Sequence, residues 1–180
     1  MLFTPLLALF SLFGLASAYC HGINAAGIAL IKKYEGFVPN VYTDPTGNPT
    51  VGYGHLCQSK GCSEVKYKFP LTEATGTKLL EDDIPTYTAC VASHIHKPLN
   101  ANQFAALTSF TFNLGCGNLA SSSLAKRINA GENPNTVAEQ EFPKWVHGGG
   151  KVLPGLVKRR AAEVALFKTA SSHQSSPGCT

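Results

Sequence analysis

The sequence predicts an α+β fold that is mostly helical, with one small N-terminal β-hairpin region packed against a helical lobe. Three observations predict it. Apolar residues recur at helical spacing through most of the chain, whereas residues 37–55 are rich in Gly and Pro and favour short strands. Residues 100–114 form a helical segment without charge whose apolar side chains cover every face. We therefore expect this segment to be the buried central helix of the core.

Residues 1–18 have the composition of a signal peptide. They carry no charged side chain, and an apolar run from Leu6 to Leu15 precedes Ala16-Ser17-Ala18, which has the small-x-small form of a signal-peptidase site. The run is shorter than the roughly 20 apolar residues of a transmembrane helix. We expect cleavage after Ala18, secretion of the protein, and no membrane anchor.

Residues 19–180 fall within the size range of a single domain. The Ser-rich residues 169–180 are expected to be a flexible tail. No amphipathic face is left over after the core is assigned, so a monomer is expected. The net charge of +4 is mild and has no dense basic run, which excludes nucleic acid as the expected partner and suits an anionic bacterial wall.

An even number of cysteines in an exported chain indicates disulfides. Cys57 and Cys62 would close a short loop, and Cys20 and Cys179 would tie the termini, although fifteen pairings remain open. The spacing lacks the second ligand pair of a zinc site, so the cysteines are not expected to bind a metal. The candidates are Cys20, Cys57, Cys62, Cys90, Cys116 and Cys179.

Glu35 is the first candidate catalytic residue. Asn24 is a suitable N-cap for a helix that ends near Glu35, and Ile28, Ile31 and Glu35 share one face of it. Desolvation on an apolar face favours the protonated carboxyl group that a general acid needs. The alternative is that Glu35 only precedes the Gly36 C-cap, with its side chain in water.

The second candidate carboxylate, Asp44, opens a stretch typical of a type I turn, at residues 44–47. Turn formation alone would explain this Asp. In the returning strand, predicted to run to residue 55, Thr50, Gly52 and Gly54 alternate onto one face. Such glycines often mark a close approach of ligand or backbone, although turn and bulge geometry is the simpler explanation. A protonated and an ionised carboxyl group together are what glycosidic bond cleavage requires.

Five more helices are expected after the hairpin. Asn100 and Gln103 form the capping box of the central helix, and a second box opens at Thr136. The last helix should place Val157, Ala161, Val164 and Phe167 inward. The expected helices cover residues 72–94 with a bend at Pro85, residues 100–114, residues 121–129, a segment from Thr136 to about Pro143, and residues 154–168.

The pattern Glu35-x8-Asp44-x5-Thr50, followed by Gly-Tyr-Gly-His-Leu at residues 52–56, resembles the catalytic segment of phage-type lysozymes, the muramidases of bacteriophage endolysins. Residues 102–115 and 145–160 resemble the central and C-terminal segments of that family, especially its lambdoid branch. The resemblance covers nearly all of the expected mature chain and implies a lysozyme-like fold.

The resemblance implies hydrolysis of the β-1,4 bond between N-acetylmuramic acid and N-acetylglucosamine in peptidoglycan, without a metal or cofactor. Glu35 would be the general acid, Asp44 the base or electrostatic partner, and Thr50 would help to hold the attacking water. The family resembles inverting enzymes, whose two carboxyl groups lie about 6.5 to 9.5 Å apart.

The resemblance also assigns supporting roles. It implies that His55 is structural and forms an ion pair with Asp83. The residues expected to line the sugar cleft are Leu56, Phe112, Asn113 and Ser123.

Three alternatives stay open at this point. A non-catalytic wall-binding or chitin-binding protein would use the same cleft, and a lytic transglycosylase would use the same glutamate. A Cys/His peptidase or amidase would need a free thiol beside a histidine. Feeding on bacteria and defence against them are hypotheses of equal standing.

Overall fold

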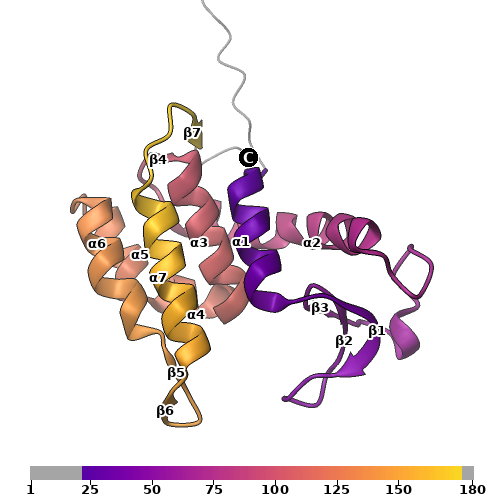
Figure 1. Ribbon diagram of the computed structural model, residues 1–180. Coiled ribbons are helices and arrows are strands. Elements are labelled where there is room, and N and C mark those ends of the chain that lie inside the picture. Colours follow the sequence, from indigo (N-terminus) through magenta and orange to yellow (C-terminus); the bar gives the residue numbers. More distant parts are fainter. Residues whose placement is uncertain (1–21, 176–180) are drawn as a thin grey trace, which may run out of the picture.

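The structure is a computed structural model that describes residues 22–175. It has a helical lobe and a smaller β-sheet lobe, with helix α2 reaching from one to the other (Figure 1). The expected mostly helical α+β class is therefore confirmed. The expected signal peptide, Cys20 and Cys179 lie outside the described residues. Among those described, no helix is long and apolar enough to cross a bilayer.

The helices and strands are bounded as follows. The α-helices are α1 (Ala25–Glu35), α2 (Glu73–His94), α3 (Ala101–Leu114), α4 (Cys116–Ser121), α5 (Ser123–Asn129), α6 (Pro134–Glu141) and α7 (Pro154–Lys168). The strands are β1 (Val38–Thr43), β2 (Pro49–Gly52), β3 (His55–Leu56), β4 (Leu99–Asn100), β5 (His147–Gly148), β6 (Lys151–Val152) and β7 (Gln174–Ser175).

The β-sheet lobe contains an antiparallel sheet in the order β1-β2-β3. The expectation of a single returning strand up to residue 55 was wrong, because β2 ends at Gly52 and the chain turns before β3 begins. Gly52 and Gly54 have φ angles of +67° and +85°. Residues with a β-carbon rarely adopt this left-handed conformation, so the two glycines form the turn instead of one strand face.

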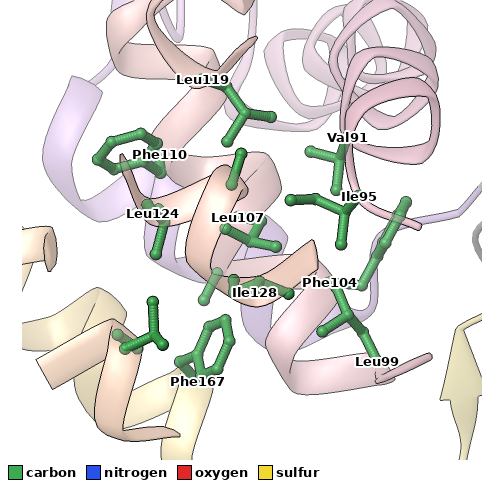
Figure 2. Close-up of a cluster of buried hydrophobic side chains, with 14 of the residues drawn as sticks. Val91, Ile95, Leu99, Phe104, Leu107, Phe110, Leu119, Leu124, Ile128 and Phe167 are labelled. Carbon is green, nitrogen blue, oxygen red and sulfur yellow. The ribbon is translucent and has the colours of Figure 1, made fainter. Parts of the chain in front are cut away.

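Helix α3 is the centre of the helical lobe, as predicted. Its N-cap Asn100 and Gln103 form the expected capping box. Every residue from Gln103 to Thr111 is buried. Phe104, Leu107 and Phe110 pack in the main cluster together with side chains from the surrounding helices (Figure 2).

The bounds of helix α2 also agree with the prediction. Its N-cap Thr72 accepts a hydrogen bond from the backbone of Thr75, and Pro85 lies inside the helix. Leu80 and Ile84 pack with Ile31 of α1 and with Tyr53, which lies between β2 and β3. This cluster attaches the β-sheet lobe to the helices, and so fixes the position of the sheet relative to the end of α1.

Two details of the C-terminal half differ from the predictions. Residues 116–129 form two helices, α4 and α5, because Ser122 leaves the helical conformation and caps α5. Helix α6 begins at Pro134 rather than Thr136, because Asn133 accepts hydrogen bonds from the Asn135 and Thr136 N–H groups. Pro134 then fits the first turn, where its missing N–H costs nothing.

The inward face of α7 was predicted wrongly in part. Val157 and Ala161 are exposed, whereas Arg159, Arg160 and Glu163 are buried. Phe167 is buried as expected. Hydrophobic periodicity misassigned this face because charged side chains can be buried when they are paired with one another.

The disulfides Cys57–Cys62 and Cys90–Cys116 are both present. The first closes the loop after β3, and the second joins α2 to α4. Residues 169–175, predicted to belong to a flexible tail, instead include β7, which pairs with β4. The N–H of Ala101 donates to the carbonyl oxygen of His173, so backbone hydrogen bonds hold this segment at the start of α3.

Candidate active site

Glu35 is the last residue of α1 and points toward the turn between β2 and β3. A β-carbon built on Gly54 would lie 3.3 Å from Glu35 Oε2, so the glycine leaves room for the Glu35 side chain. The other oxygen, Oε1, lies 2.6 Å from Nη1 of Arg159. The Glu35 side chain is 21% exposed. Its surroundings therefore combine partial burial with a buried cation, rather than the purely apolar face expected.

Arg159 belongs to a buried polar network that reaches Glu35 from α7. Its Nε lies 3.2 Å from Glu163 Oε1, and its Nη2 donates to the Ser109 carbonyl oxygen at 3.2 Å. The Ser109 hydroxyl donates to Glu163 Oε1 at 2.8 Å. Helix α3 supplies Ser109 and α7 supplies both charged residues, so the central helix and the last helix together position the Glu35 carboxylate.

Asp44 lies in the turn between β1 and β2. Its carboxylate accepts hydrogen bonds from the backbone N–H groups of Asn48 and Thr46, both at 2.8 Å, and from the Thr46 hydroxyl. These hydrogen bonds, that from Asn48 first, hold the pKa of Asp44 below its usual range. Asp44 therefore forms the predicted turn and also carries an ionised carboxylate, so its two interpretations are compatible.

Thr50 is in β2, where its backbone faces Tyr42 of β1 and Leu56 of β3. Only 3% of the residue is exposed. Its hydroxyl donates to the carbonyl oxygen of Asn48 at 3.1 Å. This bond uses the single hydroxyl proton, so the Thr50 oxygen offers lone pairs, and not a proton, to any further partner.

His55 joins β3 to two carboxylates. Its Nδ1 lies 2.9 Å from Oδ2 of Asp83, the contact expected from the sequence, and its Nε2 lies 3.3 Å from Oε1 of Glu64. The hydrogen bond to Asp83 is the main reason that the pKa of His55 is raised. Glu64 also accepts the backbone N–H groups of Gln58 and Ser59. His55 therefore connects the sheet, α2 and the Cys57–Cys62 loop.

The four expected cleft residues are in different surroundings. Leu56 is 47% exposed and Phe112 is half-buried, with its ring 4.7 Å from that of Tyr87. Asn113 Oδ1 accepts a hydrogen bond from Arg160 at 2.9 Å, which leaves the Asn113 NH2 group as the donor for a ligand.

The fourth, Ser123, lies beside a second buried carboxylate. Its hydroxyl donates to Glu141 Oε2 at 2.7 Å. Burial opposes ionisation of Glu141, but hydrogen bonds from Lys144, Arg127 and Ser123 lower its pKa to about 2. Ser123 thus connects the first turn of α5 with the end of α6.

Arg159, Glu163 and Glu64 were not predicted as site residues from the sequence. A signal existed for the first two, because Arg159 and Glu163 stand four residues apart on one helix, a spacing that pairs opposite charges. No local signal relates Arg159 to Glu35, which is 124 positions away in the chain.

Two groupings of potential metal ligands occur within residues 22–175. They are Cys90, His94 and Cys116, and Cys57, Cys62 and Glu64. In each grouping the two cysteines are joined to each other as a disulfide. Outside the disulfide, the first grouping therefore offers only His94 as a ligand and the second only Glu64.

Comparisons with known proteins identify the family of this chain. The family model described as phage lysozyme matches residues 32–163, which include Glu35, Asp44, Thr50 and the Arg159–Glu163 pair. The chain belongs to the phage lysozyme family. It is therefore a glycoside hydrolase by family, and its helical α+β fold is the lysozyme-like fold that the resemblance implied.

Individual relatives support the assignment to the phage lysozyme family. The chain is 39% identical over 158 residues to an endolysin of Bacillus phage PZA, with 87% of this chain and 58% of that protein covered. It therefore spans little more than half of that relative. It is 38% identical to an endolysin of Acyrthosiphon pisum secondary endosymbiont phage 1, with 82% of this chain and 99% of the relative covered.

A solved structure gives the same result. The muramidase domain of SpmX from Asticaccaulis excentricus superimposes with a TM-score of 0.71 at 34% identity. The match covers 83% of this chain and 99% of that domain. The phage lysozyme fold therefore extends over both lobes of this chain.

Proposed function

We propose that this phage lysozyme relative is a secreted muramidase, which hydrolyses the β-1,4 bond between N-acetylmuramic acid and N-acetylglucosamine in bacterial peptidoglycan. The observation that carries the proposal is the environment of Glu35. Arg159 holds one carboxyl oxygen, and Gly54 leaves space beside the other. A carboxyl group fixed at one oxygen, in a side chain that remains 21% exposed, suits a general acid that protonates the leaving glycosidic oxygen.

Asp44 would be the ionised partner in this reaction. Hydrogen bonds from the Asn48 and Thr46 N–H groups keep its carboxylate charged, as activation of water or stabilisation of an oxocarbenium-like centre requires. Thr50, with its lone pairs available, would accept a hydrogen bond from the attacking water. With a water placed between the two carboxyl groups, the product should have inverted anomeric configuration.

Substrate binding would use Leu56, Phe112, Asn113 and Ser123. The two disulfides and the leader-like residues 1–18 support export, because disulfides persist in oxidising compartments. We further propose that the exported protein acts on the wall as a monomer and uses no metal or cofactor.

The test is the clearing of a suspension of bacterial walls. Glu35→Gln keeps the size of the side chain and removes the acid, so we expect the lytic rate to fall by at least about a hundredfold. Glu81→Gln changes an exposed glutamate of α2 and serves as the matched control, with full activity expected. Equal clearing by wild type and Glu35→Gln would refute the acid role.

The products separate hydrolysis from the alternatives. Mass analysis of released muropeptides should show hydrated reducing ends, whereas anhydro ends would identify a lytic transglycosylase. Binding to walls without any release of muropeptides would identify a non-catalytic wall-binding protein. NMR of the first-formed anomer should show inversion, and retention would refute the proposed placement of water between Glu35 and Asp44.

A further inference from the structure

Helix α7 carries a cluster of charges that the proposed reaction does not use directly. Arg159, Arg160 and Glu163 are only 3%, 1% and 0% exposed. Ion pairs connect them to each other and, through Arg159, to Glu35. Charged side chains are rarely buried this completely unless they are paired. The cluster therefore needs an explanation beyond core packing.

We propose that Glu163 is a positioning residue for Glu35 and acts through Arg159. This inference rests on the proposed function, because it assigns a further role within the same site. Glu163 fixes the guanidinium group whose far end holds the Glu35 carboxylate, and it balances the charge that surrounds that carboxylate.

The orientation of Arg159 depends on Glu163. Three parts of the guanidinium group have separate acceptors: Nη1 faces Glu35, Nε faces Glu163, and Nη2 faces the Ser109 carbonyl. Glu163 is itself held by the Ser109 hydroxyl. A planar group held at several nitrogens cannot rotate, so Arg159 presents Nη1 to Glu35 in one fixed direction.

Glu163 is also the counter-ion of Arg160. Arg160 Nε lies 2.8 Å from Glu163 Oε2, an ion pair without hydrogen-bond alignment, and Arg160 Nη2 lies 3.2 Å from Glu163 Oε1. Burial lowers the pKa of Arg160 and raises that of Glu163, while each favours the charged form of the other. With both Glu163 and Glu35 ionised, the two arginines and two glutamates of the cluster have no net charge, and protonation of Glu35 leaves one positive charge.

Removing the Glu163 charge would therefore change the ionisation of Glu35. Glu163→Gln keeps the shape of the side chain and gives the cluster one excess positive charge, which favours the ionised form of Glu35. Two further ionisable side chains near the cluster are Tyr34 and Tyr87. The Tyr34 ring centroid is 5.9 Å from the Arg159 guanidinium carbon, and the pKa of Tyr87 is raised by burial first and then by Asp83 and Glu35. Both rings are unchanged in the variant.

The experiment measures kcat and KM against pH with soluble, uncross-linked peptidoglycan strands. Glu163→Gln should lower kcat by about ten- to a hundredfold with KM changed by less than about twofold, the usual effect of losing a group that orients a functional residue. The basic limb of the pH profile should move to lower pH, because a general acid must be protonated. A second change, Arg160→Gln, restores neutrality and should return this limb toward its original position.

Glu139→Gln is the matched control. Glu139 is exposed on α6 and forms an ion pair with Lys168, near the C-terminal end of α7. The control therefore removes a surface ion pair between a glutamate and a cation of α7. Its kcat and pH profile should equal those of the wild type. If Glu163→Gln does not fold, Ser109→Ala removes one hydrogen bond from Glu163 and should lower kcat in the same direction by a smaller factor.

Three results would overturn the inference. The first is a basic limb of the pH profile that does not move in folded Glu163→Gln. The second is a change in KM alone in this variant, and the third is an equal fall of kcat in Glu163→Gln and Glu139→Gln. If Ser109→Ala has to replace Glu163→Gln, an unchanged kcat in folded Ser109→Ala would also overturn it. Glu35→Gln separates this failure from failure of the proposed function: an inactive Glu35→Gln with a fully active Glu163→Gln rejects only the positioning role, whereas an active Glu35→Gln rejects the acid role itself.

Discussion

His55 Nδ1 lies 2.9 Å from Asp83 Oδ2 and so joins strand β3 to the middle of helix α2. The imidazole is 12% exposed and the carboxylate 24% exposed. His55 directly follows Gly54, at which an added β-carbon would lie 3.3 Å from Glu35 Oε2. The contact therefore stabilises the part of the sheet nearest to the candidate catalytic glutamate.

The His55–Asp83 pair should make stability depend on pH. The pKa of folded His55 is raised, mainly by the hydrogen bond to Asp83, so the contact stabilises the protein fully below the unfolded pKa and this stabilisation is lost as pH rises through the folded pKa. Asp83→Asn should reduce the free energy of unfolding by about 1.5 to 3 kcal/mol near pH 5. The loss should be much smaller well above the folded pKa of His55.

Denaturant unfolding of the wild type and of Asp83→Asn, at pH 5 and well above the folded pKa of His55, measures the difference in unfolding free energy. Glu81→Gln removes one negative charge from an exposed position on the same helix and controls for net charge. If Asp83→Asn costs the same at every pH, protonated His55 does not contribute through this contact. Glu64 remains beside His55 Nε2 in the variant, so some pH dependence should persist.

The two disulfides should contribute unequally to stability. Cys90–Cys116 closes a separation of 26 residues and Cys57–Cys62 one of 5. If constraint of the unfolded chain dominates, removing the first by paired Cys→Ala changes should cost about 3.5 kcal/mol and removing the second about 2 kcal/mol. Each pair has one buried cysteine. Equal costs in urea unfolding would show that loop length does not set the contribution.

The start of α6 offers a test between two N-caps. Asn133 accepts the N–H groups of Asn135 and Thr136, whereas the sequence favoured Thr136 as the cap. Asn133→Ala should therefore cost about 1 kcal/mol of unfolding free energy. Thr136→Ala should stay within about 0.5 kcal/mol, as for an ordinary surface change. A larger loss in Thr136→Ala would restore the prediction made from the sequence.

Local signals predicted most of the fold. The Asn24 cap, the Asn100–Gln103 capping box and Pro154 at the first turn of α7 all have their causes within a few residues, and all agree with the structure. Helix α6 shows the limit of such signals, because two suitable caps lie three residues apart. Asn133 is the cap because its side chain accepts the N–H groups of Asn135 and Thr136, and Pro134 then lies in the first turn of the helix.

Long-range pairing could not be predicted in the same way. The inward face of α7 consists largely of charged residues whose partners lie on α1 and α3, so no periodicity in α7 alone identifies it. Similarly, Gly52 and Gly54 were wrongly kept in one strand, and the group nearest to Gly54 is the Glu35 side chain rather than a ligand or a backbone segment. Both the turn and the contact with Glu35 depend on how the sheet packs against the end of α1.

Gly54 gives the most direct test of the space beside Glu35. Gly54→Ala would place a β-carbon 3.3 Å from Glu35 Oε2, so the carboxylate or the turn must move by a few tenths of an ångström. The left-handed backbone, at φ +85°, adds strain of about 1 to 2 kcal/mol. We expect the lytic rate per folded molecule to fall by at least about tenfold, because small displacements of a catalytic group are costly.

Gly131→Ala is the matched control, because its φ of +86° imposes the same strain. A β-carbon there would meet only Lys97 side-chain atoms at 3.9 Å, an ordinary contact. Both variants should therefore lose unfolding free energy, measured by denaturant titration, with any extra loss in Gly54→Ala reflecting the displacement beside Glu35, while only Gly54→Ala loses activity. Similar lytic rates in the two variants would show that the contact between Gly54 and Glu35 does not limit the reaction. A fall confined to Gly54→Ala would show that backbone strain alone cannot account for the loss, and that the space beside Oε2 is needed for activity.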